Sequence, residues 1–113
     1  MTETIDFKKL GDEYADVLRR VISGESTLIC VGQTWDEAYA ADVAFTVDGW
    51  HISIFNDCDS VDYTDSITAP DGRHAEFSDL FDICADPICY TTFNIDNDEI
   101  ERALKAARRA RND

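Results

Sequence analysis

The stretch that decides the fold is residues 42–55, DVAFTVDGWHISIF, in which an Asp-Gly pair separates two alternating segments. The apolar residues at alternate positions are Val43, Phe45 and Val47 before the pair and Ile52 and Ile54 after it. Alternation with a period of two is typical of a half-buried strand. Asp48 and Gly49 both tolerate positive φ, which a tight hairpin turn requires. The stretch therefore predicts an antiparallel β-hairpin.

The strand pattern continues beyond this hairpin. Asn56-Asp57 closes its second strand, and residues 60–68 alternate again, which predicts a third antiparallel strand. The residues expected on one side of that strand are Val61, Tyr63, Asp65 and Ile67. Pro70-Asp71-Gly72 predicts a turn, because proline fixes φ and glycine allows the left-handed step. Residues 73–77 then predict a fourth strand.

Four shorter segments give weaker patterns. Residues 27–31 are β-branched and apolar and predict a short strand, whereas residues 33–41 fit a helical turn or a loop. Residues 76–83 fit either a short helix or a continued strand. Residues 88–93, which follow the Asp86-Pro87 break, fit a strand or a buried connector.

Two amphipathic helices flank the strands. Residues 6–23 place their apolar side chains on one helical face, with Asp6 or Thr4 as the N-cap and Gly24 as the C-cap. Residues 96–110 begin with a capping-box pattern and carry acids early and bases late, the order that a helix dipole favours. Together the patterns predict a single α+β domain over residues 1–113. We expect an antiparallel β-meander of three to five strands with the N- and C-terminal helices packed on one face.

Charge is the strongest compositional signal. The chain has 24 acids against 10 bases and a net charge of −14. Thirteen of the acids lie in residues 36–86, together with one base, Arg73. The negative electrostatic potential of so many acids disfavours direct binding to nucleic acid or to an anionic membrane. No signal peptide and no apolar run long enough to span a bilayer is seen, so we expect a soluble cytoplasmic protein with reduced thiols.

The acids themselves are the leading candidate for a functional surface. Strand-borne acids on one sheet face repeat about every 7 Å, close to the spacing of phosphates along a nucleic-acid strand. We therefore expect a non-enzymatic protein, without a cofactor, that occludes the basic nucleic-acid-binding surface of a partner protein. A nucleic-acid-mimic inhibitor, including a phage or prophage anti-defence protein, is the narrow form of this hypothesis, and a generic acidic solubility surface is its alternative. The partner-binding candidates are Asp57, Asp59, Asp62 and Asp65, with Asp48, Asp71, Glu76 and Asp79.

Three other hypotheses remain open. A small metal-binding module would use the cysteine and histidine set or the acidic run, although the run fails the calcium-loop pattern. The set is Cys58, His74, Cys84 and Cys89. A small enzyme would use His51 or His74 as its base. A homodimer would join the basic helix ends, at Arg19, Arg20 and residues 105–111, to the acidic sheet of another copy.

Several short motifs resemble a family of small uncharacterised bacterial proteins with a DGW…NDCD…DY…PDGR…DP pattern. The matching segments are Val47–Trp50, Phe55–Asp59, Asp62-Tyr63, Ala69–Arg73 and Asp86-Pro87. The resemblance covers about the middle two-thirds of the chain. It implies a compact domain rich in turn-forming residues, and it brings no activity and no site residue.

Overall fold

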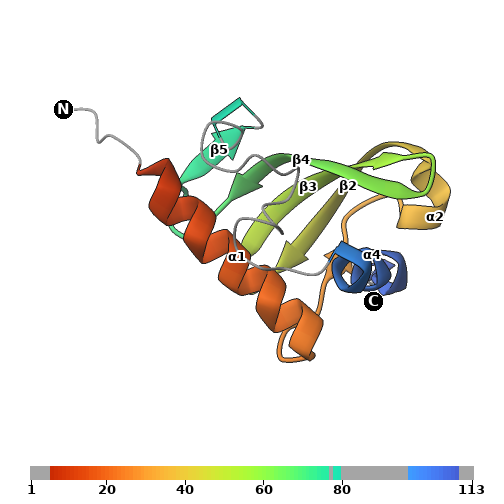
Figure 1. The fold of residues 1–113 in the computed structure, drawn as a ribbon, viewed down its shortest axis with the longest axis horizontal. Coiled ribbons are helices and arrows are strands. Elements are labelled where there is room, and N and C mark those ends of the chain that lie inside the picture. Colours follow the sequence, from red (N-terminus) through yellow and green to blue (C-terminus); the bar gives the residue numbers. More distant parts are fainter. Residues whose placement is uncertain (1–5, 77, 80–96, 110–113) are drawn as a thin grey trace.

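The computed structural model describes residues 6–76, 78–79 and 97–109, which form one mixed sheet with helices on one side (Figure 1). The strands are β1 (Ile29–Cys30), β2 (Ala40–Val47), β3 (Trp50–Asp57), β4 (Ser60–Thr68), β5 (His74–Glu76) and β6 (Arg108–Arg109). Their order in the sheet is β5-β4-β3-β2-β1-β6. All neighbours are antiparallel except β6, which runs parallel to β1. The predicted meander is confirmed as β2 to β5.

The predicted hairpin joins β2 to β3. Asp48 and Gly49 have φ of 50° and 83°, the left-handed values that a two-residue turn needs. A Cβ added at Gly49 would lie 3.1 Å from Cγ of Pro70, so this turn packs against the loop between β4 and β5. Glycine is therefore required here both for its φ and for the close approach of the neighbouring loop.

β4 departs from the predicted alternation. Its pairing with β3 shifts register twice, so that Ile54 pairs with Thr64 rather than with Asp65. Thr64 is buried, and its hydroxyl shares a 2.9 Å hydrogen bond with the hydroxyl of Tyr14. Asp65 instead lies beside Ser66, which pairs with Ser53 on the side of the sheet away from the helices. The prediction that Asp65 shares a side with Ile67 is thus wrong, because each shift sets two β4 residues against one β3 residue.

Two long helices cover the inner side of the sheet (Figure 1). α1 (Phe7–Ser23) begins where the Asp6 side chain accepts a hydrogen bond from the Lys9 amide, and it ends at Gly24, which has φ of 87°. α4 (Asn97–Ala106) contributes buried residues to the same core. The core also includes Trp35 from the short helix α2 (Trp35–Ala38). The predicted α+β class, with helices from both ends of the chain, is confirmed.

The C-terminal helix is shorter than predicted. α4 ends at Ala106, and Arg108 and Arg109 pair with Ile29 and Cys30 as a parallel edge strand. Arg108 and Arg109 pair with β1 instead of extending the helix, because this pairing satisfies the backbone polar groups of a strand edge that would otherwise be open. The patterns over residues 80–83 and 88–93, and the cap at Asp96, lie outside the described residues.

A helix that crosses a bilayer needs about 20 consecutive, mostly apolar residues. Among the residues that the structure describes, no helix combines this length with sufficient apolar character.

Candidate functional site

The predicted partner-binding acids divide between opposite ends of the sheet. The turn at Asp48 and the loop at Asp71 lie at one end, because β2 and β4 both run toward it. The turn that carries Asp59 lies at the other end, where β3 finishes at Asp57. The expected repeat along one strand is therefore wrong, since Asp57 ends a strand and Asp59 lies in a turn. Asp62 belongs to β4, but its side chain lies outside the described residues.

At the Asp48 end, the acids are engaged within the molecule. Asp48 accepts hydrogen bonds from Ser26 (2.5 Å) and from Nε of Arg20 (3.3 Å), and these lower its pKa, with Ser26 contributing most. Arg73 binds Asp71 at 2.8 Å and donates to both carboxylate oxygens of Glu13, at 2.7 and 3.0 Å. The Arg73 hydrogen bonds lower the pKa of both acids. Arg73 thus fastens the loop between β4 and β5 to α1.

Glu76 and Asp79 are engaged near β5. Nε2 of His74 lies 3.2 Å from the Glu76 carboxylate, and Nδ1 of the same ring lies 2.8 Å from the Thr68 hydroxyl. The Asp79 carboxylate accepts a hydrogen bond from the Glu76 amide at 3.0 Å. These contacts join residues that are close to one another in the chain. Glu76 and Asp79 therefore stabilise the end of the sheet at β5.

The opposite end of the sheet brings α2 against the turn between β3 and β4 (Figure 1). We call this surface the Tyr39 end; it consists of Asp36, Glu37, Tyr39, Asp57, Cys58 and Asp59. All six residues are exposed, and Tyr39 is 62 % exposed. Three of the four non-glycine residues with positive φ in the described chain, Tyr39, Cys58 and Asp59, lie here. Such backbone values are unfavourable and persist only where the surrounding structure imposes them.

A buried asparagine imposes the conformation of this end. Asn56 is fully buried, its Nδ2 donates to the Trp35 carbonyl at 2.8 Å, and its Oδ1 accepts from the Asp59 amide at 2.7 Å. One side chain thereby joins α2 to the turn. The sequence alone indicated only a strand terminator at this position. A signal was present, because Asn56 follows Ile52 and Ile54 in the core-facing phase, where a polar group needs buried partners.

Two cations reach the Tyr39 end from the C-terminal segment, and each binds an acid. Nζ of Lys105 lies 3.4 Å from Asp59, and Arg109 donates a hydrogen bond to Glu37. The Arg109 bond, followed by that from the Thr34 amide, lowers the pKa of Glu37 to about 2. Four acids against these two cations leave the Tyr39 end negative.

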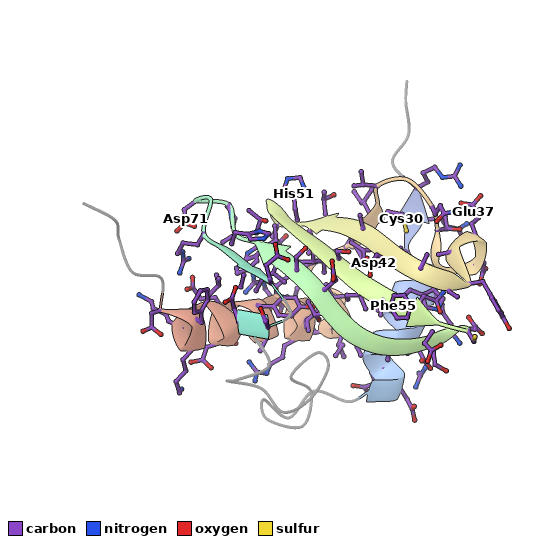
Figure 2. The ribbon with its side chains drawn as sticks, turned by 90° about the horizontal axis from the view of Figure 1, so that it is seen from above. Cys30, Glu37, Asp42, His51, Phe55 and Asp71 are labelled. Carbon is purple, nitrogen blue, oxygen red and sulfur yellow. The ribbon has the colours of Figure 1, made fainter. Side chains whose placement is uncertain are left out.

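Two further acids, Asp42 and Asp65, lie on the side of the sheet away from the helices. Asp42 pairs with Phe55 across the hairpin, and Figure 2, which looks down on the sheet, shows the two side chains together. Partial desolvation of the Asp42 carboxyl, followed by repulsion from Asp65, raises its pKa. The charged form of Asp42 is therefore disfavoured in the folded protein.

We expect Asp42→Asn to raise the melting temperature by about 1–3 °C at pH 7. A carboxyl whose folded-state pKa is raised lowers stability above that pKa, and this loss disappears below the unfolded pKa of about 3.9. The gain should therefore vanish near pH 3, as followed by thermal unfolding at both pH values. Asp57→Asn, at an exposed strand end, is the matched control and should leave the melting temperature unchanged. A gain at pH 3 equal to that at pH 7 would contradict this explanation.

The structure separates the metal candidates. Cys58 lies in the turn after β3, and His74 begins β5 at the opposite end of the sheet, so the two cannot bind one ion. Cys84 and Cys89 lie outside the described residues. Within residues 6–76, 78–79 and 97–109, no three metal-binding side chains come together.

Two hollows bear on the enzyme hypothesis. One of about 220 Å³ lies on the open sheet face and includes His51, Ser53, Ser66 and Thr68 in its lining. His51 is the one acid or base among the lining residues of this hollow, so it has no second titratable group there to work with. Another of about 510 Å³ lies between the ends of α1 and α4, and its lining is mostly apolar, with Ser26, Thr27, Arg108 and Arg109 as the polar residues. Neither hollow brings His51 or His74 to a second acid–base group.

Comparison with known proteins identifies a family. Residues 11–106 match the family model described as a domain of unknown function, DUF7693. The comparisons with curated proteins and with solved structures find no match. The expected membership of an uncharacterised family is confirmed at this level. Because the match spans most of its length, the chain belongs to the DUF7693 family.

Proposed function

We propose that the protein is a non-enzymatic binding module that engages a basic protein surface through its Tyr39 end. The observation that carries this proposal is the exposed Tyr39, which stands among Asp36, Glu37, Asp57 and Asp59. A tyrosine anchor within a charged rim is the usual anatomy of a protein interface, and tyrosine is enriched among the residues that dominate binding energy.

The net charge of −14 supports a basic partner. Opposite charge accelerates encounter over distances of about a Debye length and makes the complex sensitive to salt. Surfaces that bind nucleic acid are rich in lysine and arginine, so a protein that binds nucleic acid is the partner class that this proposal favours. Inhibition of such a partner, including anti-defence activity, is the narrow form of the proposal. The phosphate spacing lends it no support, because the acids do not follow one strand.

The conformation of Tyr39 adds support. Its φ of 46° and ψ of −60° lie outside the favoured regions for a residue with a side chain. Strain of this kind costs about 1–3 kcal/mol, and it is commonly found where a side chain must be presented to a ligand. Tyr39→Gly is therefore expected to raise stability while it weakens binding, whereas a tyrosine without a binding role would give only the first effect.

The test is capture of partners from a host lysate at low salt, followed by titration of the purified partner. Asp36→Lys/Asp57→Lys is expected to weaken binding at least tenfold and to leave the fold intact. Glu25→Lys/Asp12→Lys makes the same change in net charge elsewhere and should weaken binding only about twofold to threefold, through slower encounter. Equal loss in both double variants would place binding outside the Tyr39 end. If no basic protein is captured at low salt, the proposal fails.

A further inference from the structure

The hollow of about 510 Å³ at the ends of α1 and α4 continues into a second hollow of about 380 Å³. Both are lined by Val21 of α1 and by Ala103 and Ala106 of α4, so together they form one groove between the two helices (Figure 1). We call it the helix groove. Pockets for small molecules commonly enclose about 300–1,000 Å³ and have mostly apolar walls with a few polar groups. The helix groove has both properties.

The walls of the helix groove suit an aliphatic chain. Its apolar residues are Val21, Ile22, Leu28, Ile29, Ala103, Ala106 and Ala107. Ile29 is 39 % exposed, so apolar surface is available to a ligand here. Among the described residues that line the groove, none is aromatic, and a flat ring would find no stacking partner. A hydrocarbon chain laid through the two joined hollows would instead remove apolar surface from water along its length.

Two arginines of the helix groove have no acid to bind. Arg102 lines the smaller hollow, and Arg108 lines the larger one together with its strand partner Ile29. Within the described part of the chain, neither arginine forms a hydrogen bond or an ion pair, whereas Arg109 binds Glu37. The chain has 24 acids and 10 bases, so composition alone predicts an acid partner for each arginine. An unpaired guanidinium group matches a carboxylate, to which it donates two parallel hydrogen bonds.

The two arginines differ in their surroundings. Arg102 shares its hollow with Glu99, which would repel a bound carboxylate. The larger hollow has no acid among its described lining residues, so Arg108 is the better partner for an anion. Both helices end at this hollow, and the carbonyl end of a helix carries about half a negative charge. Neither the backbone nor the net charge of −14 would therefore attract an anion, and its binding must depend on arginine side chains.

We propose that the helix groove binds an unbranched aliphatic carboxylate, of which a free fatty acid is the simplest kind. The chain lies between α1 and α4, and the carboxylate binds Arg108. A free ligand is favoured over a lipid bilayer, because the negative charge of the protein opposes approach to an anionic membrane. The site goes beyond the proposed function, since no residue of the Tyr39 end lines the groove.

Isothermal titration calorimetry with decanoate, below the concentration at which it forms micelles, tests the proposal. Decanoate is expected to bind one site at least tenfold more tightly than decyltrimethylammonium, which has a chain of similar length and the opposite charge. Net charge alone predicts the reverse order, so a cation that binds as tightly as decanoate overturns the proposal. Octanoate should bind more weakly by about twofold to fourfold for each methylene group removed. Equal affinity for the two acids would show that the chain does not lie in the groove.

Three variants locate the ligand. Arg108→Gln is expected to weaken decanoate binding at least tenfold, whereas Arg102→Gln, which removes the same charge beside Glu99, should weaken it about twofold to threefold. Ala106→Phe places a ring in the groove from an exposed position at the end of α4 and should weaken binding at least tenfold. Circular dichroism establishes that each variant is folded. Equal losses in the two arginine variants, or unchanged binding in Ala106→Phe, overturn the proposal.

Two further measurements distinguish other occupants of the helix groove. Self-association in sedimentation equilibrium that Ala106→Phe abolishes would assign the groove to a second copy of the chain. Flotation with phosphatidylglycerol vesicles that Ala106→Phe abolishes would assign it to a membrane surface. Either result overturns the proposal, and we expect neither. Partner capture through the Tyr39 end is measured without decanoate, so either proposal can fail alone.

Discussion

Asn56→Ala is expected to lower the free energy of unfolding by about 2–4 kcal/mol and the melting temperature by about 10 °C or more. The substitution removes both hydrogen bonds that join α2 to the turn between β3 and β4. It leaves the Trp35 carbonyl and the Asp59 amide without their partner. A buried polar group that loses its partner costs about 1–3 kcal/mol, which applies to the buried Trp35 carbonyl, and the partly buried Asp59 amide adds a smaller cost.

Chemical denaturation measures this loss, and two further variants define its cause. Asn56→Asp keeps an oxygen for the Asp59 amide but sets a second oxygen against the Trp35 carbonyl. We expect a loss of similar size at pH 7 that becomes smaller as the pH falls toward the unfolded pKa of about 3.9, because the buried carboxyl is protonated in the folded protein and again donates. Asp57→Asn, the exposed neighbour, should change stability by less than about 0.5 kcal/mol. An Asn56→Ala variant as stable as wild type would refute the bridging role.

The second large effect is expected at the hydrogen bond between Tyr14 and Thr64. Both side chains are buried, and their oxygens lie 2.9 Å apart between α1 and β4. Burial raises the pKa of Tyr14, so the phenol remains protonated at physiological pH. Tyr14→Phe and Thr64→Val are each expected to lower the free energy of unfolding by about 1–3 kcal/mol, since each leaves one buried hydroxyl unpaired.

The double variant tests whether the pair acts together. Tyr14→Phe/Thr64→Val removes both hydroxyls, so no buried hydroxyl is left without its partner. We expect it to cost less than the sum of the single variants by about 1 kcal/mol or more. Strict additivity would show that the hydroxyls contribute independently, and the hydrogen bond would then no longer explain why Thr64 turns toward the core.

The parts of the fold that depend on local sequence, such as the hairpin turn and the helix cap, were predicted from the sequence. The hairpin at Asp48-Gly49 and the cap at Gly24 follow from residues that tolerate positive φ, and both positions have it. The irregular course of β4 did not follow, because its alternation in sequence is overridden by Tyr14, which comes from α1. The strand at Arg108–Arg109 was missed for the same reason, since its partner is Ile29–Cys30.

The candidate site was predicted less well than the fold. Counting acids located the acidic segment of the chain, but it could not reveal that Asp48, Asp59 and Asp71 bind cations from α1, α4 and the loop before β5. Nor did it single out Tyr39, which is exposed and has a positive φ at the end of α2, where Asn56 joins α2 to the turn between β3 and β4. Those facts rest on contacts between distant parts of the chain, which composition does not record.

The parallel pairing of β1 with β6 has a consequence for synthesis on the ribosome. The β2–β3–β4 meander is complete in sequence at Thr68, so it is able to form while later residues are still being added. The outer edge of β1, however, stays unpaired until Arg108 and Arg109 have emerged from the ribosome. Throughout that interval a nascent chain exposes an unpaired strand, the kind of edge that invites mispairing between neighbouring polypeptides. Translation speed over the last helix should therefore influence the yield of correctly assembled protein.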